Sequence, residues 1–301
     1  MVNLVTAHQA LLRRLMKSAG VLPHTVQINA GTVINIWAPS DTLDKPAVVL
    51  VHGFSADGIM TWQFQVGPLS KKYAVYVPDL LFFGGSATDS PDRSPEFQAE
   101  CLAEALRSLG VQRYTVVGFS YGGVVALKMA GMWPDLVAAA VVSGSVVEMT
   151  ESSSSAIVEE LGFSSLSEFL LPTSVKECRE LFKVAVHRKF WFPDRLYGDF
   201  LKVMFYNRKE RAELLEGLVV TTKDKALPNF TQRIHLLWGE NDQIFKMELA
   251  RDMKQQLGEK TTLQGIKKAG HLVHLERPCV YNRCLKEFLA SLHATDDEAR
   301  K

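Results

Sequence analysis

The sequence predicts an α/β protein: a mostly parallel eight-stranded sheet with helices on both faces and a helical insertion after the sixth strand. Three observations carry this prediction. Short apolar runs alternate with helical patterns along most of the chain, which is typical of parallel sheets. The alternation stops between about residues 146 and 227, where the pattern is helical. The 301 residues, 47% of them hydrophobic, suffice to bury a large core.

Composition excludes several functional classes. The 34 basic and 33 acidic residues give a net charge of +1, so the chain has no electrostatic footprint for nucleic acid. No apolar run approaches the ~20 residues that cross a bilayer. The four cysteines form neither a disulfide framework nor a C-x-x-C zinc pair. We therefore expect buried or free thiols in a reducing, cytoplasmic location.

Residues 1–20 are interpreted as a helical extension. Leu4, His8, Leu11 and Leu15 fall on one helical face, and the three basic residues of the segment lie largely elsewhere. The continuous apolar core of a secretion signal is missing. We expect the helix to pack on the domain, and organelle targeting or contact with a membrane surface are the alternatives.

Residues 21–145 and 228–295 are expected to form the α/β core. Its eight strands are predicted at 25–29, 32–37, 47–51, 73–77, 114–117, 137–142, 233–238 and 261–266. Most of these runs are wholly apolar, as expected for strands that are buried on both faces. Between them, Ser94 followed by Pro95 predicts the start of a helix, and Gly110 predicts its end.

Residues 146–227 are predicted to form a helical lid, not a second independent fold. Ser152–Ser155 is interpreted as a polar loop, and capping-box patterns begin helices at Ser165 and Ser174. Another helix is expected after Pro193. The lid is rich in aromatic residues, which favours an apolar or aromatic ligand.

The stretch from Gly118 to Gly122 has the pattern G-x-S-x-G, with Ser120 at its centre. An apolar strand precedes it and a helical pattern follows, which is the context of a nucleophile elbow. A serine hydroxyl is a poor nucleophile and must be held, exposed, beside a base. The two glycines leave room for the sharp turn. Ser120 is the predicted nucleophile.

An acid and a base follow in the order typical of this arrangement. Asp242 comes after the seventh strand, and His271 comes after the eighth. Glu240 and Glu148 are the competing acids. Glu240 follows a glycine too closely to reach far, and Glu148 is more typical of a solvated lid position. Asp242 is therefore the predicted acid and His271 the predicted base.

His52 and His274 are the competing histidines. We expect His52 to hold its loop by hydrogen bonding. His274 and Glu276 could form metal ligands with His271, but the run should instead begin the last helix, and no third ligand cluster is evident. We expect no metal and no organic cofactor.

Together these segments resemble the α/β-hydrolase superfamily from about Val21 to Ala290. The matching segments are His52-Gly53-Phe54, Pro78-Asp79-Leu80 with Gly84-Gly85-Ser86, Gly118–Gly123, Trp238–Asp242 and Gly270-His271. The single lid is similar to that of epoxide hydrolases, haloalkane dehalogenases and the carbon–carbon hydrolases of meta-cleavage pathways, and the chain also resembles uncharacterised plant members. The resemblance implies an oxyanion hole formed by the N–H groups of Phe54 and Tyr121. We expect these two side chains, with Phe190 and Trp191 of the lid, to bind substrate.

The departures from these relatives narrow the function. Epoxide hydrolases and dehalogenases use an aspartate where this chain has Ser120, which argues against both activities. Meta-cleavage hydrolases usually carry a tryptophan soon after the catalytic histidine, where this chain has Leu272 and Val273. The predicted function is hydrolysis of a small-molecule carboxylic ester through an acyl-enzyme. Carbon–carbon hydrolysis and a small-ligand receptor on the same fold remain the alternatives.

Overall fold

A computed structural model describes residues 2–41, 45–189, 191–220 and 229–298, with side chains described as far as Leu292. In chain order the strands are β1 (Val21–Asn29), β2 (Thr32–Pro39), β3 (Ala47–Val51), β4 (Ala74–Pro78), β5 (Ala87–Thr88), β6 (Tyr114–Phe119), β7 (Val137–Ser143), β8 (Met149–Thr150), β9 (Val219–Val220), β10 (Arg233–Gly239) and β11 (Thr261–Ile266). The helices are α1 (Leu4–Ser18), α2 (Gly58–Thr61), α3 (Val66–Ser70), α4 (Pro95–Ser108), α5 (Tyr121–Met132), α6 (Glu151–Glu160), α7 (Leu166–Leu170), α8 (Val175–Ala185), α9 (Asp194–Met204), α10 (Arg208–Leu218), α11 (Met247–Leu257), α12 (Val273–Glu276) and α13 (Pro278–Glu298).

The main sheet has the strand order β1-β2-β4-β3-β6-β7-β10-β11, and the short β5 pairs with β2. Neighbours from β4 onward are parallel, whereas β1, β2 and β4 pair antiparallel. All eight strands expected from the sequence are present, and the prediction of a mostly parallel α/β sheet is confirmed. The first strand begins four residues earlier than expected.

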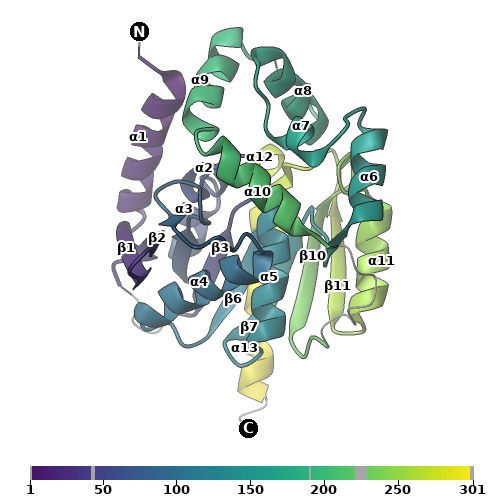
Figure 1. The fold of residues 1–301 in the computed structure, drawn as a ribbon. Coiled ribbons are helices and arrows are strands. Elements are labelled where there is room, and N and C mark those ends of the chain that lie inside the picture. The colour runs from purple at the N-terminus through teal and green to yellow at the C-terminus, as the bar shows by residue number, and fades with distance from the viewer. Residues whose placement is uncertain (1, 42–44, 190, 221–228, 299–301) are drawn as a thin grey trace.

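Helices cover both faces of the sheet (Figure 1). Successive side chains of β3 point to opposite faces of the sheet, so this apolar strand contributes to two cores. Val49 and Val51 join the core beneath α4 and α5, and Val48 and Leu50 join the opposite core beneath α3 and α13. Because parallel strands end at one edge, the loops after β3, β6, β7, β10 and β11 meet there.

Helices α6–α10, here called the inserted helices, lie between β7 and β10 (Figure 1). The expectation of a polar loop at Ser152–Ser155 is wrong, because these residues belong to α6. The Thr150 hydroxyl accepts from the Ser153 amide at 3.1 Å, and the Ser153 hydroxyl accepts from the Thr150 amide at 3.0 Å. The serines therefore start a helix by forming a capping box.

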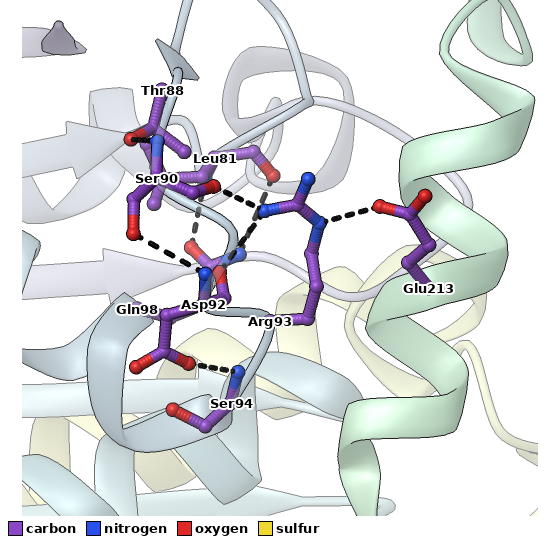
Figure 2. Close-up of polar contacts among 8 residues, drawn as sticks. All are labelled: Leu81, Thr88, Ser90, Asp92, Arg93, Ser94, Gln98 and Glu213. Atoms are coloured by element: carbon purple, nitrogen blue, oxygen red, sulfur yellow. Dashed lines mark hydrogen bonds and ion pairs between the residues drawn. The ribbon is translucent and has the colours of Figure 1, made fainter.

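Two carboxylates, those of Glu213 and Glu276, are among the groups that fasten the inserted helices to the sheet domain, as is the ion pair of Glu160 with Lys246. Figure 2 shows the first, in which Arg93 reaches from the loop before α4 to Glu213 on α10, with Nε and Oε2 2.8 Å apart. The second is Glu276, whose carboxylate accepts the backbone amides of His187 (2.9 Å to Oε2) and Arg188 (3.0 Å) after α8. Glu276 also accepts the amide of Gly270 at 2.7 Å. It therefore ties the inserted helices to the loop after β11.

Helix α1 packs its Val5, Leu12 and Met16 side chains inward. Its N-terminus lies beside α9, where the Leu4 amide donates to the Asp199 carboxylate at 2.8 Å (Figure 1). Among the described helices, none combines the length and the apolar character needed to cross a bilayer.

Candidate active site

Ser120 occupies a strained turn between β6 and α5. Its backbone has φ +54° and ψ −123°, a conformation that non-glycine residues rarely adopt. The Ser120 amide donates to the Ser143 carbonyl at 2.9 Å, and the Ser145 hydroxyl donates to the Ser120 carbonyl at 2.7 Å. Bonds to the neighbouring segment therefore hold the turn in place. Such strain is a feature of nucleophile elbows.

The two glycines of the motif allow close backbone contacts. A Cβ atom on Gly122 would lie 2.2 Å from the His52 carbonyl oxygen, and one on Gly118 would lie 2.4 Å from the Gly122 carbonyl oxygen. A side chain at Gly122 would push the elbow away from the end of β3, and one at Gly118 would clash with the first turns of α5. The spacing G-x-S-x-G is thus required by packing around Ser120.

His271 and Asp242 form a buried pair at the same edge of the sheet. His271 Nδ1 lies 2.9 Å from Asp242 Oδ2, and the two side chains are 7% and 1% exposed. The other carboxylate oxygen, Oδ1, accepts the amides of Ile244 at 2.8 Å and Phe245 at 3.0 Å. These bonds fix the carboxylate, so that it orients the histidine ring with Nε2 free to act on a substrate.

The competing acids lie elsewhere. The Glu148 carboxylate forms an ion pair with Lys128 of α5, with Oε1 3.2 Å from Nζ. Glu240 is exposed. Neither residue hydrogen-bonds to His271, whose described acidic partner is Asp242.

The competing histidines are both buried. His52 Nε2 accepts the Leu80 amide at 2.9 Å and His52 Nδ1 lies 2.7 Å from the Gly53 carbonyl oxygen, so the ring holds its loop as expected. Burial lowers the pKa of His52 to about 4. Burial, together with the nearby His271, lowers the pKa of His274 to about 3. Both rings are therefore neutral at physiological pH.

The Phe54 amide lies in the loop after β3, and the Tyr121 amide belongs to the first residue of α5, directly after Ser120. Neither amide donates a hydrogen bond to a described protein group. For Tyr121 this follows from its place in the first turn of a helix, where amides lack intrahelical acceptors. Both N–H groups therefore lack an acceptor among the described residues.

A cavity of about 510 Å³ opens beside these residues and is lined by Phe54, Ser120 and His271. The inserted helices supply about half of its apolar lining residues. The contributing side chains there are Leu170, Leu181, Phe182, Ala185, Phe192, Leu196, Tyr197 and Phe200. A smaller cavity of about 40 Å³ lies on the other side of Ser120, where Tyr121 is part of the lining. Ser120 and His271 thus face two spaces of unequal size.

The Ser120 hydroxyl and the His271 ring are not hydrogen-bonded to each other in this structure. Such a contact commonly tightens when substrate binds.

The expected lid contacts need one correction. Trp191 is 84% exposed and does not line either cavity, whereas the neighbouring Phe192 does. Consecutive side chains of a non-helical segment point to different sides, so only one of the two can face the cavity. Phe190 lies outside the described residues.

Four residues that contribute to the site were missed from the sequence. Leu4, Val5 and His8 of α1 line the larger cavity. Gly144, directly after β7, packs against the ring of His271. The apolar face of α1 was a visible signal, but nothing local in the sequence indicates what this face contacts.

The pattern of His271, His274 and Glu276 does not form a ligand cluster. His271 pairs with Asp242, and Glu276 accepts backbone amides. Within the described ranges, no group of three or more histidine, cysteine, aspartate or glutamate side chains is placed to hold a metal ion.

Comparison with known proteins places this arrangement among hydrolases. A family profile for the alpha/beta hydrolase fold matches residues 46–278. Monoacylglycerol lipase ABHD6 of Bos taurus is 28% identical over 274 residues, which cover 85% of this chain and 79% of the lipase. The structure of a bacterial membrane phospholipase A has a TM-score of 0.81 at 23% identity, covering 96% of this chain and 91% of that one. The structure of 2-hydroxy-6-oxo-6-phenylhexa-2,4-dienoate hydrolase from Rhodococcus has a TM-score of 0.75 at 20% identity, covering 90% and 99%.

Proposed function

The chain belongs to the α/β-hydrolase fold family, and from this premise we propose that it is a serine hydrolase that cleaves a carboxylic ester of an apolar or aromatic small molecule. The observation that carries the proposal is the strained Ser120 elbow beside a buried His271–Asp242 pair, at one wall of an apolar cavity. Epoxide hydrolysis and dehalogenation through an aspartate nucleophile are disfavoured, because position 120 is serine.

In the proposed mechanism, His271 accepts the proton of the Ser120 hydroxyl as its oxygen attacks the ester carbonyl. Asp242 orients the ring and stabilises its protonated form. The amides of Phe54 and Tyr121 donate to the oxyanion. Loss of one such donor typically slows turnover by about 10²–10³-fold. His271 then protonates the departing alcohol, and water activated by the same residue releases the acid and restores Ser120.

The inserted helices are proposed to act as a lid, residues 146–227, over a core of residues 21–145 and 228–295. Their apolar side chains form much of the wall opposite Ser120. The larger cavity suits one apolar half of an ester, and the smaller cavity leaves room for little more than a short group on the other side. An ester with one bulky apolar part and one small part is therefore the proposed substrate class.

Activity-based labelling tests the proposal without knowledge of the substrate. A fluorophosphonate probe should label the wild-type protein at Ser120, and Ser120→Ala should abolish both labelling and hydrolysis of p-nitrophenyl esters. The variant should unfold at nearly the same temperature, because it loses one small hydroxyl. Labelling of a different serine would refute the elbow assignment.

A ring-fission dienoate substrate and the labelling result together separate the alternatives. Turnover of a ring-fission dienoate but not of p-nitrophenyl esters would favour carbon–carbon hydrolysis. The observation that makes this alternative worth testing is the similarity of the fold to that of the Rhodococcus enzyme. Labelling at Ser120 with negligible turnover of any ester would favour a receptor role.

A further inference from the structure

The outer face of α1 carries an apolar stripe. The described part of the chain has nine large apolar side chains that are exposed, and four of them lie in its first fifteen residues. They are Val2 (72% exposed), Leu4 (41%), Leu11 (51%) and Leu15 (48%), here called the α1 stripe. Leu4, Leu11 and Leu15 are spaced by seven and four residues, so they share one side of the helix. A contiguous apolar surface of this kind marks an interaction site.

The stripe is held rigidly at the edge of the candidate active site. The Asn3 side chain and Asp199 of α9 cap the first turn of α1, and Gln9 donates to Asp57 at 2.8 Å. Leu4 belongs to the stripe and also lines the larger cavity. His8, between Leu4 and Leu11 on the same face, lines it too and contacts Gln63 at 3.1 Å. The next residue, Phe64, is itself 45% exposed. The apolar surface therefore continues from the stripe to the cavity wall.

The charge of α1 indicates what covers the stripe. Arg13, Arg14 and Lys17 are on the helix, and residues 2–20 contain no acidic side chain. None of the three forms an ion pair with a described acidic residue. Arg14 lies about 90° around the helix from the stripe, and Arg13 and Lys17 lie on the opposite side, where they line a cavity that Asp57 and Asp79 also line. A helix that is apolar on one side and basic on another is complementary to the surface of an anionic bilayer.

We propose that α1 docks the protein onto anionic lipid surfaces, with the stripe in the interface and the cavity wall beside it. An ester in that surface would then pass along Leu4 and His8 to Ser120 without crossing water. The docking itself is independent of catalysis, and only the delivery of an ester to Ser120 rests on the proposed function.

Vesicle co-sedimentation of the full chain carrying Ser120→Ala tests docking without hydrolysis. Vesicles of phosphatidylcholine alone and vesicles with about one third phosphatidylglycerol are the two probes. We expect tight binding to the anionic vesicles that weakens as salt is raised. Leu11→Asp combined with Leu15→Asp should lower the partition constant at least tenfold. The matched control is Met132→Asp at the end of α5, a 38% exposed apolar residue away from α1, which should bind as the parent does.

A second set of variants separates charge from apolar contact. Replacing Arg13, Arg14 and Lys17 by Gln should reduce anionic binding to the level of the neutral vesicles while keeping the stripe intact. Equal binding by the stripe variant and the parent, or no binding to either vesicle, would overturn the proposal. A dimer in solution that the stripe variant disperses would also overturn it, with a second copy as the occupant.

Catalytic measurements then test delivery. Leu11 and Leu15 do not line the cavity, so with Ser120 restored their substitution should leave hydrolysis of a soluble short-chain ester unchanged. Hydrolysis of a long-chain ester held in anionic vesicles should fall at least tenfold. Absence of any ester hydrolysis, with vesicle binding intact, would remove the proposed function and leave docking standing.

Discussion

Gly144 directly follows β7, and its backbone has φ +52°. A Cβ atom there would lie 2.7 Å from His271 Nδ1, 2.8 Å from Cε1 and 3.1 Å from Asp242 Oδ2. The nearest of these is the nitrogen that binds Asp242. A methyl group would therefore displace the ring or break its bond to the carboxylate, and no flexible side-chain end is available to yield.

We predict that Gly144→Ala lowers kcat/KM for a p-nitrophenyl ester at least 10²-fold, because misplacing a catalytic group by about 1 Å costs this much. Gly162→Ala is the matched control, since Gly162 has φ +79° but no atom within 4 Å of the added Cβ. Both variants carry the cost of a left-handed backbone, on the order of 1 kcal/mol. Thermal unfolding measures this shared cost. Equal kcat/KM in the two variants would show that the close contact with His271 does not matter.

At the residue scale, sequence patterns predicted the groups that meet at the site better than those that surround it. Ser120, Asp242 and His271 each follow a strand in a local pattern, and the structure brings the three to one edge. Gly144 has no such pattern, because its role depends on a ring 127 positions away in the sequence. Trp191 was misplaced because an aromatic residue in an irregular segment gives no sign of the side on which it lies.

At the scale of elements, Glu276 connects the inserted helices to the histidine loop. One carboxylate accepts the His187, Arg188 and Gly270 amides, and the Leu272 amide donates to the Ala185 carbonyl at 3.1 Å. Gly270 and Leu272, the residues before and after His271, thus both donate hydrogen bonds that join the histidine loop to Glu276 or to the end of α8. Movement of the inserted helices at this point would alter the position of the His271 backbone.

We predict that Glu276→Gln lowers kcat about tenfold or more with little change in KM, because one carboxylate oxygen is replaced by an NH₂ group facing a backbone donor. Hydrogen exchange of the His187 and Arg188 amides should quicken. Glu213→Gln is the control, since it weakens another anchor, at Arg93, away from His271 (Figure 2). This control should retain kcat within about twofold. Unchanged exchange in Glu276→Gln would contradict the assigned role of the carboxylate.

Which elements were predictable follows from where their stabilising contacts lie. The strands β3, β6, β7 and β10 are apolar runs because both of their faces are buried, and that burial is visible locally. The pair β8–β9 joins residues 149–150 to 219–220, and two-residue segments carry no periodic signal. The contact of α1 with α9 spans 195 positions in the sequence. Such pairings depend on the assembled fold and could not be predicted from a local pattern.

At the scale of the whole molecule, three of the histidines with described side chains are buried and form no hydrogen bond or ion pair with a carboxylate. Burial lowers the pKa of His52 and of His235 to about 4, helped at His235 by the charge of Arg233. Burial and the neighbouring His271 lower the pKa of His274 to about 3. In the unfolded chain a histidine titrates near ~6.5. Below that pH the unfolded state takes up protons that the native state does not.

The free energy of unfolding should therefore fall as the pH falls below about 6.5. The stability contributed by these three neutral rings is fully present above the unfolded pKa and is lost as the pH falls toward 4 and 3. Each histidine then lowers the free energy of unfolding by on the order of 1 kcal/mol per pH unit. Asp57 and Asp79 act with the opposite sign, because burial raises the pKa of each carboxyl above its usual range. They favour the native state at low pH, so the histidine effect is measured as the difference between a histidine variant and the wild type at the same pH.

Urea unfolding at half-unit intervals from pH 7.5 to 5 measures this slope. His235 lies away from the candidate active site, stacked on Phe288 with ring centroids 4.7 Å apart and with Nδ1 2.7 Å from the Thr262 hydroxyl. We predict that His235→Gln removes about one third of the acid slope, because glutamine can keep the bond to Thr262 and does not titrate. His24→Gln is the control, since His24 is exposed in the folded protein as it is in the unfolded chain. A slope that is the same in wild type and His235→Gln would show that the native protein takes up a proton at His235, and that burial does not keep this ring neutral.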